Sequence, residues 1–115
     1  ELNLVIKNGN YGWPHSSYGT NYLKENGGDG KSINSNHELN NFNEPLLALV
    51  PSIGISEIVK IGQNKYVVSS LKDKALYFFE LDKNSFLINL NRVEVSERIR
   101  DMQFKTRKLF CIFFL

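Results

Sequence analysis

The chain has 115 residues, which is the size of one ordinary domain and excludes two independent hydrophobic cores. Its charges are scattered and give a net charge of +2, so the basic surface typical of nucleic-acid-binding proteins is not expected. Hydrophobic residues make up 42%, and the longest apolar run, Leu109 to Leu115, is far shorter than a membrane span, which predicts a soluble globular chain. The single cysteine, Cys111, excludes an internal disulfide and a site with several cysteine ligands.

The first part of the chain is predicted to be mainly a long loop. Leu2, Val5 and Ile6 have the spacing of one helix face, and Gly9 stands where a C-terminal cap would be, which indicates a short helical turn at the start. From Asn8 to Pro45 the sequence is rich in Gly, Asn, Ser and Tyr. Loops of this length without internal secondary structure are uncommon in a compact domain unless they have a function, so we expect the segment to cover a face of a structure larger than itself.

From Pro45 onward the pattern predicts seven short strands. The segments between several of them are short and polar, as tight antiparallel hairpins require, so consecutive strands should pair as a meander. Two continuous apolar runs, 66–68 and 76–79, suit strands covered on both faces, whereas the alternation from Phe86 to Asn91 predicts a strand with one wet face. This favours an all-β fold, either a sandwich or a pair of propeller blades. The predicted strands are Leu46 to Val50, Glu57 to Ile61, Tyr66 to Ser70, Ala75 to Leu81, Phe86 to Val95, Ile99 to Phe104 and Leu109 to Leu115.

Aromatic residues and glycines recur regularly between residues 10 and 22. Gly12 and Gly19 would supply backbone conformations closed to other residues. The aromatic side chains could pack as a lid, while the alternative is a structural loop stapled by its aromatics. The residues concerned are Tyr11, Trp13, Tyr18 and Tyr22.

Two arginines near the end of the chain are candidate ligand-binding residues. In a strand, Arg98 and Arg100 would lie on one face, about 7 Å apart, and form a fork suited to a polycarboxylate or phosphate. Alternatively they lie on a solvated face, paired with Glu97 and Asp101. Lys72, at the end of a strand, could add a third cation, although a lysine at a hairpin tip is commonly just solvated.

Several catalytic and metal-binding patterns do not match. The run from Gly27 to Ser32 resembles the end of a phosphate-binding loop but lacks its first glycine and a preceding strand. His15 and His37 have no third ligand at usable spacing for zinc, and Asp29 does not begin an EF-hand loop. We therefore expect no metal site and no catalytic residue in this chain.

Four motifs, in this order, resemble the soluble pyrroloquinoline-quinone-dependent aldose sugar dehydrogenases, the glucose/sorbosone dehydrogenase family of six-bladed β-propellers. The first, an aromatic loop, has two parts, Asn10 to Pro14 and Tyr18 to Tyr22; a proline-serine segment, a strand-then-lysine segment and a double-arginine segment follow. The last three are Val50 to Ser56, Val68 to Lys74 and Glu97 to Asp101. Past Phe104 the chain departs from the family pattern.

The resemblance implies a set of roles. Lys72, Arg98 and Arg100 would contact the quinone cofactor, which carries three carboxylates, while the general-base histidine and the ligands of the cofactor's calcium would come from earlier blades. The parent would oxidise the anomeric carbon of an aldose to the lactone, pass electrons to an acceptor, and be periplasmic or secreted, although no signal peptide is visible here. The alternative is a non-catalytic propeller that binds carbohydrate or protein.

Residues 1–115 would thus be part of one propeller domain, with a loop region at 1–45 and antiparallel blade strands at 46–115. The strands amount to about one and a half to two blades. The fragment alone is expected to be inactive. Its terminal run, Leu109 to Leu115, has the composition of an aggregation-prone edge, so its removal is expected to improve solubility.

Overall fold

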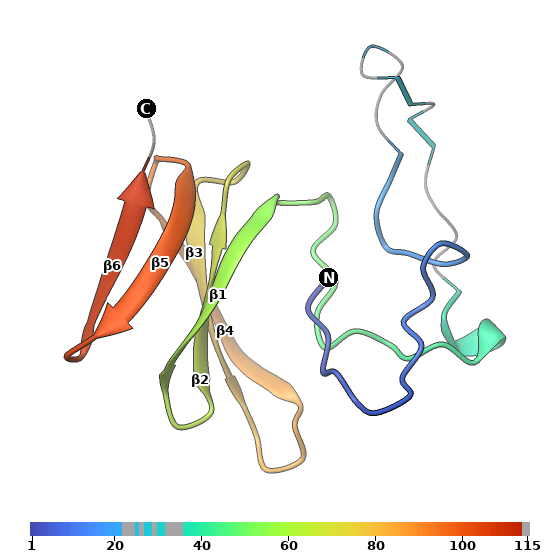
Figure 1. Ribbon diagram of the computed structural model, residues 1–115, viewed down its shortest axis with the longest axis horizontal. Helices are drawn as coiled ribbons and strands as arrows, with labels where there is room; N and C mark the ends of the chain where they lie inside the picture. The colour runs from blue at the N-terminus through green and yellow to red at the C-terminus, as the bar shows by residue number, and fades with distance from the viewer. Residues whose placement is uncertain (22–24, 26, 29, 32–35, 114–115) are drawn as a thin grey trace. The chain divides into compact units, whose positions relative to one another are not determined.

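The computed structural model describes residues 1–21, 25, 27–28, 30–31 and 36–113. The chain separates into two compact units, Glu1–Pro51 and Ser52–Leu115. All six strands of the described residues belong to the second unit (Figure 1).

The second unit contains two antiparallel sheets. Four strands pair in chain order as a meander, β1-β2-β3-β4, and the last two strands form a separate hairpin, β5-β6. Residues with positive φ occupy each hairpin turn, among them Asn64, Lys74, Ser85 and Thr106, and they supply the twist that tight turns need. The strands are β1 (Ile55–Gly62), β2 (Lys65–Ser70), β3 (Ala75–Leu81), β4 (Leu87–Glu94), β5 (Ile99–Lys105) and β6 (Lys108–Phe113).

The core of this unit lies where β5 packs against β1 and β2. Val67 of β2, Leu76 of β3, and Ile99 and Met102 of β5 form one buried apolar cluster. A β-bulge between Ile99 and Asp101 lets both Ile99 and Met102 face inward although they are three residues apart. The hairpin is thereby attached to the four-stranded sheet by its apolar side chains.

The two central strands are buried on both faces, as their continuous apolar runs predict. Val67 and Val68, which are neighbours in β2 and so point to opposite faces, are both buried, and Phe79 of β3 stacks on Tyr66 of β2 with ring centroids 5.5 Å apart. The all-β fold class is confirmed, and the predicted meander is confirmed for β1 to β4, whereas the consecutive strands β4 and β5 belong to different sheets. A four-stranded meander followed by a hairpin fits a fragment of one and a half propeller blades.

Three local predictions are wrong. The first residues form no helical turn; Leu2 instead makes an isolated bridge with Leu47. Leu46 to Val50 is not a strand, and among the described residues its main-chain hydrogen bonds are those that Leu46 and Leu47 form with Leu2. The alternation in β4 is interrupted at Asn89, which has a φ of 55° beside a bulge opposite Phe79, and almost the whole strand is exposed.

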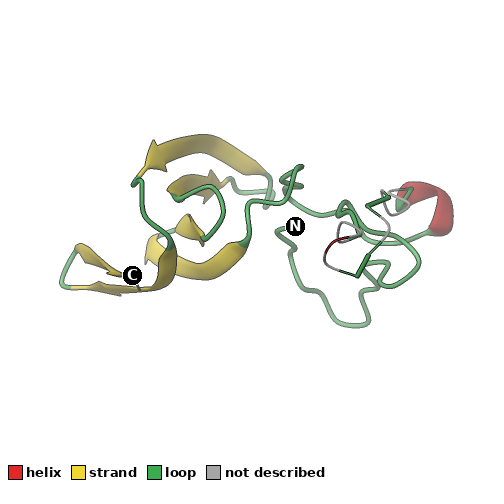
Figure 2. Ribbon diagram, turned by 90° about the horizontal axis from the view of Figure 1, so that it is seen from above, coloured by secondary structure: helices red, strands yellow, loops and turns green. Residues whose placement is uncertain are grey.

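In its described part, the first unit consists mainly of loops and includes the short 3-10 helix η2 (Glu38–Asn40) (Figure 2). Its centre is His37, which is completely buried. The Ser16 hydroxyl lies 2.9 Å from Nδ1 of His37, and Nε2 of His37 lies 3.1 Å from the carbonyl oxygen of Tyr11. Nε2 donates to that carbonyl oxygen, which can only accept, and the ring holds two distant loop segments together.

Candidate functional site

Lys72 lies in the turn between β2 and β3, whose main chain is tied to the residues just before β1. The N–H groups of Leu71 and Lys72 donate to the carbonyl oxygens of Gly54 and Ile53 at 2.8 and 3.0 Å. The Ser70 hydroxyl donates to the same Ile53 carbonyl at 2.5 Å. The backbone of Lys72 is therefore fixed, while its side chain is exposed.

The other side of this turn is tied to the connection between β4 and β5. The carbonyl oxygen of Lys74 accepts hydrogen bonds from the N–H groups of Val95 and Ser96, at 2.9 and 3.1 Å. These two residues lead directly into the segment that carries Arg98. One continuous set of main-chain hydrogen bonds thus joins the lysine turn to the arginine segment.

Arg98 and Arg100 flank Ile99, which is anchored at the start of β5. The Ser56 hydroxyl of β1 lies 2.8 Å from the Ser69 hydroxyl and donates to the carbonyl oxygen of Ile99 at 2.7 Å. The Ile99 side chain is completely buried, whereas both arginines are exposed. The core thus holds the backbone here and leaves both guanidinium groups in solvent.

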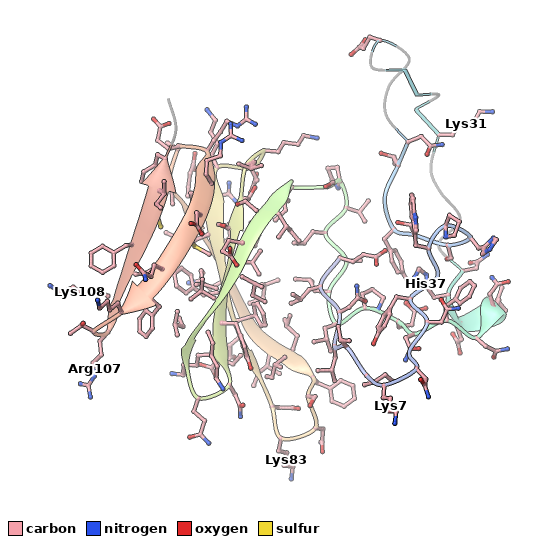
Figure 3. The ribbon with its side chains drawn as sticks, viewed as in Figure 1. Lys7, Lys31, His37, Lys83, Arg107 and Lys108 are labelled. Carbon is pink, nitrogen blue, oxygen red and sulfur yellow. The ribbon has the colours of Figure 1, made fainter. Side chains whose placement is uncertain are left out.

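The three cations belong to one end of the second unit, which we call the cationic end. It is the end at which β1, β3 and β5 begin and β2 and β4 finish (Figure 1). The sequence segments that supply the cations are 26 residues apart, and the meander brings them to the same end. Lys83 and Arg107, by contrast, lie in the turns at the opposite end (Figure 3).

None of the three cations forms an ion pair with a carboxylate of the described residues. The ion pairs found there are Lys65–Glu80, Arg92–Asp73 and Arg92–Glu94. The pairs of Arg98 and Arg100 with Glu97 and Asp101, considered from the sequence, do not occur among these. Asp101 instead accepts a hydrogen bond from the N–H of Met102 at 2.8 Å.

A polar network anchors the turn beside Lys72. Arg92 of β4 donates from Nε to Oδ2 of Asp73 at 2.8 Å, and the Tyr77 hydroxyl donates to the same oxygen. The hydrogen bond from Arg92, followed by that from Tyr77, lowers the pKa of Asp73. Burial, followed by the hydrogen bond to Asp73, raises the pKa of Tyr77. Asp73 is therefore ionised and Tyr77 remains a proton donor at neutral pH.

In the first unit, the aromatic residues have different surroundings. The Tyr11 hydroxyl accepts from the Ile6 N–H at 2.8 Å and donates to the Leu4 carbonyl at 2.7 Å. Tyr18 stacks on His37 and donates to Glu44, which raises the pKa of its hydroxyl. These two tyrosines hold segments of the loop together through their hydrogen bonds. The side chain of Trp13, by contrast, is 74% exposed to solvent. Tyr22, the fourth aromatic residue, lies outside the described residues.

Among the residues described, no three His, Cys, Asp or Glu side chains come together as a metal site. His15 is exposed and His37 is occupied by its hydrogen bonds. Asp29 and Ser32 of the glycine-rich run lie outside the described residues. Burial raises the pKa of Cys111, which keeps this thiol protonated at neutral pH.

An all-β chain with blade-like antiparallel sheets and three exposed cations at one end has the fold of a propeller fragment and the charge to receive an anionic ligand. The glucose / sorbosone dehydrogenase family model matches residues 1–112, and the chain belongs to this family. Membership of the glucose/sorbosone dehydrogenase family, which the sequence motifs indicate, is thus confirmed. Comparison with curated proteins found no match, and comparison with solved structures found none either. No helix of the described residues is long and apolar enough to cross a membrane.

Proposed function

We propose that this chain is part of a quinoprotein oxidoreductase that oxidises the anomeric carbon of aldose sugars to lactones with pyrroloquinoline quinone. Family membership supports the sugar dehydrogenase class. The observation that supports quinone binding is the cationic end. There Lys72, Arg98 and Arg100 project from a main chain that is fixed by hydrogen bonds, and none of them forms an ion pair with a carboxylate of the described residues.

The chemistry of these side chains fits the cofactor. Pyrroloquinoline quinone has three carboxylates and two quinone oxygens, all of which are hydrogen-bond acceptors. Arg98 and Arg100 would hold carboxylates through charge-assisted hydrogen bonds, and Lys72 would donate to a quinone oxygen. When bound, the cofactor supplies the acceptor for the hydride of the sugar.

The anchored backbone also helps binding. Each of the two cationic segments is hydrogen-bonded to neighbouring segments of the main chain before any ligand arrives, so less conformational entropy is lost on binding than with mobile loops. What remains to be ordered is the side chains, which are exposed. The three residues act as binding and polarising groups and leave proton abstraction to another residue.

The general-base histidine and the calcium ligands are proposed to come from other parts of the propeller. An electron acceptor and a periplasmic or secreted location are further elements of the proposal.

The test is titration of the full-length apo-protein with pyrroloquinoline quinone. Arg98→Ala and Arg100→Ala should each weaken binding by roughly 1.5 to 3 kcal/mol, the range for a hydrogen bond to a charged group. Lys72→Ala should reduce sugar-dependent dye reduction more than it reduces cofactor affinity, because its role is at the quinone oxygen.

Arg107→Ala is the matched control, because Arg107 is an exposed arginine in the turn at the opposite end (Figure 3). It should leave quinone affinity unchanged. Unchanged affinity in both the Arg98 and Arg100 variants would place these arginines on a merely solvated face. Sugar binding with no dye reduction after quinone and calcium are supplied would instead favour a non-catalytic binding module.

A further inference from the structure

The nearest carboxylate to Lys72 in the sequence is that of its neighbour Asp73, yet this carboxylate is bound elsewhere. Arg92 of β4 donates from Nε to Oδ2 of Asp73 at 2.8 Å and from Nη2 to the Asp73 carbonyl oxygen at 3.4 Å. The Tyr77 hydroxyl donates to Oδ2 as well. Asp73 is therefore directed to the β3–β4 side of the turn.

This arrangement has an electrostatic consequence for Lys72. A carboxylate released from Arg92 could pair with the adjacent ammonium group and compete with any anionic ligand for it. With Asp73 held by Arg92, Lys72 has no ion pair with a described residue. The hydrogen bond from Arg92, followed by that from Tyr77, also lowers the pKa of Asp73, so the carboxylate is ionised when Arg92 binds it.

The fold of the turn does not depend on this network alone. Leu71, Lys72 and Lys74 are held by main-chain hydrogen bonds, and Ser70 accepts from the Asp73 N–H at 2.8 Å. The Asp73 side chain can therefore be changed while most anchors of the turn remain. Substitution of Asp73 can therefore test the effect of its charge on Lys72 separately from any effect on the conformation of the turn.

We propose that Arg92 is a positioning residue that holds the Asp73 carboxylate against β4 and so keeps the Lys72 ammonium group available to an anionic, quinone-bearing ligand. The inference rests on the proposed function of Lys72. The role of Arg92 is indirect, because Arg92 acts on the ligand only through Asp73 and Lys72.

The first test measures quinone affinity of the full-length apo-protein in single and double variants. Arg92→Gln should weaken binding by about fivefold, the upper range for an exposed ion pair that now competes with the ligand. Asp73→Asn in the Arg92→Gln background should restore the affinity, because no carboxylate is left to compete. Arg92→Lys, which keeps the charge, should bind nearly as well as the wild type.

A purely structural role predicts the opposite for the double variant. If Arg92 only shapes the turn, then Arg92→Gln combined with Asp73→Asn would bind as weakly as Arg92→Gln alone, and the proposal would be overturned. Unchanged affinity in Arg92→Gln would overturn it as well.

The second test needs no quinone. Thermal unfolding of Lys72→Met, Asp73→Asn and their combination gives a double-mutant cycle, which is recorded with Arg92 present and with Arg92→Gln. The two substitutions should be additive with Arg92 present and non-additive without it, since only then do Lys72 and Asp73 pair. Additivity in both backgrounds would refute the inference. Non-additivity together with unchanged quinone affinity and unchanged sugar-dependent dye reduction in Lys72→Met would refute only the proposed role of Lys72 at the quinone.

Discussion

At the scale of single residues, the ionised state of Asp73 links pH to stability at the cationic end. Arg92 and then Tyr77 lower its pKa in the folded protein. The folded state therefore binds this proton more weakly than the unfolded chain does. The stabilisation is present above the unfolded value, about 3.9, and is lost as the pH falls through the lower folded value.

We accordingly expect Asp73→Asn to lower the melting temperature near neutral pH. The difference from the wild type should shrink as the pH falls below roughly 4, because the unfolded wild-type chain then takes up the proton more readily than the folded protein does. Thermal unfolding of both proteins across this pH range measures the difference. A constant gap down to the most acid pH would show that charge on Asp73 does not contribute.

Gly12 provides a second prediction at this scale. Its φ is 96°, and an added Cβ would lie 2.9 Å from the Ser16 carbonyl oxygen and 3.2 Å from Nε2 of His37. Gly12→Ala should therefore reduce the free energy of unfolding of the first unit by roughly 2 to 4 kcal/mol, through backbone strain and overpacking. Denaturant unfolding measures this loss.

Gly27→Ala is the matched control for Gly12→Ala. Gly27 has a similar φ of 84°, but no described atom lies within 4 Å of its added Cβ. Only the backbone contribution of roughly 1 kcal/mol is then expected. Equal losses in the two variants would mean that the contacts around His37 do not constrain Gly12.

The same residues show what local sequence could and could not reveal. The sequence indicates Arg98 and Arg100 as candidates because they flank an apolar residue at the start of a predicted strand, and Lys72 because it follows another predicted strand. The Asp73–Arg92 bond and the His37 centre were not found, since their partners lie 19 and 21 to 26 residues away and follow no periodic pattern. Such contacts depend on strand register and loop path, which composition does not encode.

At the scale of elements, the strands were predictable where an apolar pattern and a polar turn coincided. The meander from β1 to β4 has both, and its strands agree with the predicted ones to within a few residues. The segment Leu46 to Val50 has apolar residues without a hairpin partner in sequence, and it pairs with Leu2 only as an isolated bridge. A strand requires a partner as well as propensity, and the partner is a property of the fold.

Bulges are the second feature of the elements that the sequence did not reveal. The bulge at Ile99/Asp101 turns Met102 into the core, and the bulge in β4 breaks the alternation around Asn89. Each adds one residue to one strand and reverses the faces beyond it. The first one matters for the site, because it fixes the backbone from which Arg100 projects.

At the scale of the whole molecule, the cationic end results from topology more than from any one motif. Two segments that are distant in sequence come together because every connection in the meander returns the chain to the same two ends. The same topology leaves β6 with one free edge among the described residues, since it pairs only with β5. Free, apolar edges are sites of aggregation.

The structure alters the expected effect of deleting residues 109–115. In β6, Leu109 and Cys111 pack against the core cluster, whereas Phe110 and Ile112 are 53% and 45% exposed. Deletion would remove the partner of β5 and uncover Met102. The aggregation hazard therefore lies on the outer face of β6, and its inner face is required for folding.

The final prediction separates these two faces in the isolated chain of 115 residues. Phe110→Thr with Ile112→Thr keeps strand propensity, lowers the exposed apolar area, and should shift the chain from aggregates toward monomer. Deletion of 109–115 should increase aggregation, because it exposes the cluster of Ile99 and Met102. Size-exclusion chromatography with light scattering compares the three proteins. If the deleted chain were the more soluble monomer, β6 would not be part of the folded unit, and the pairing of β5 with β6 would be refuted as a stabilising element.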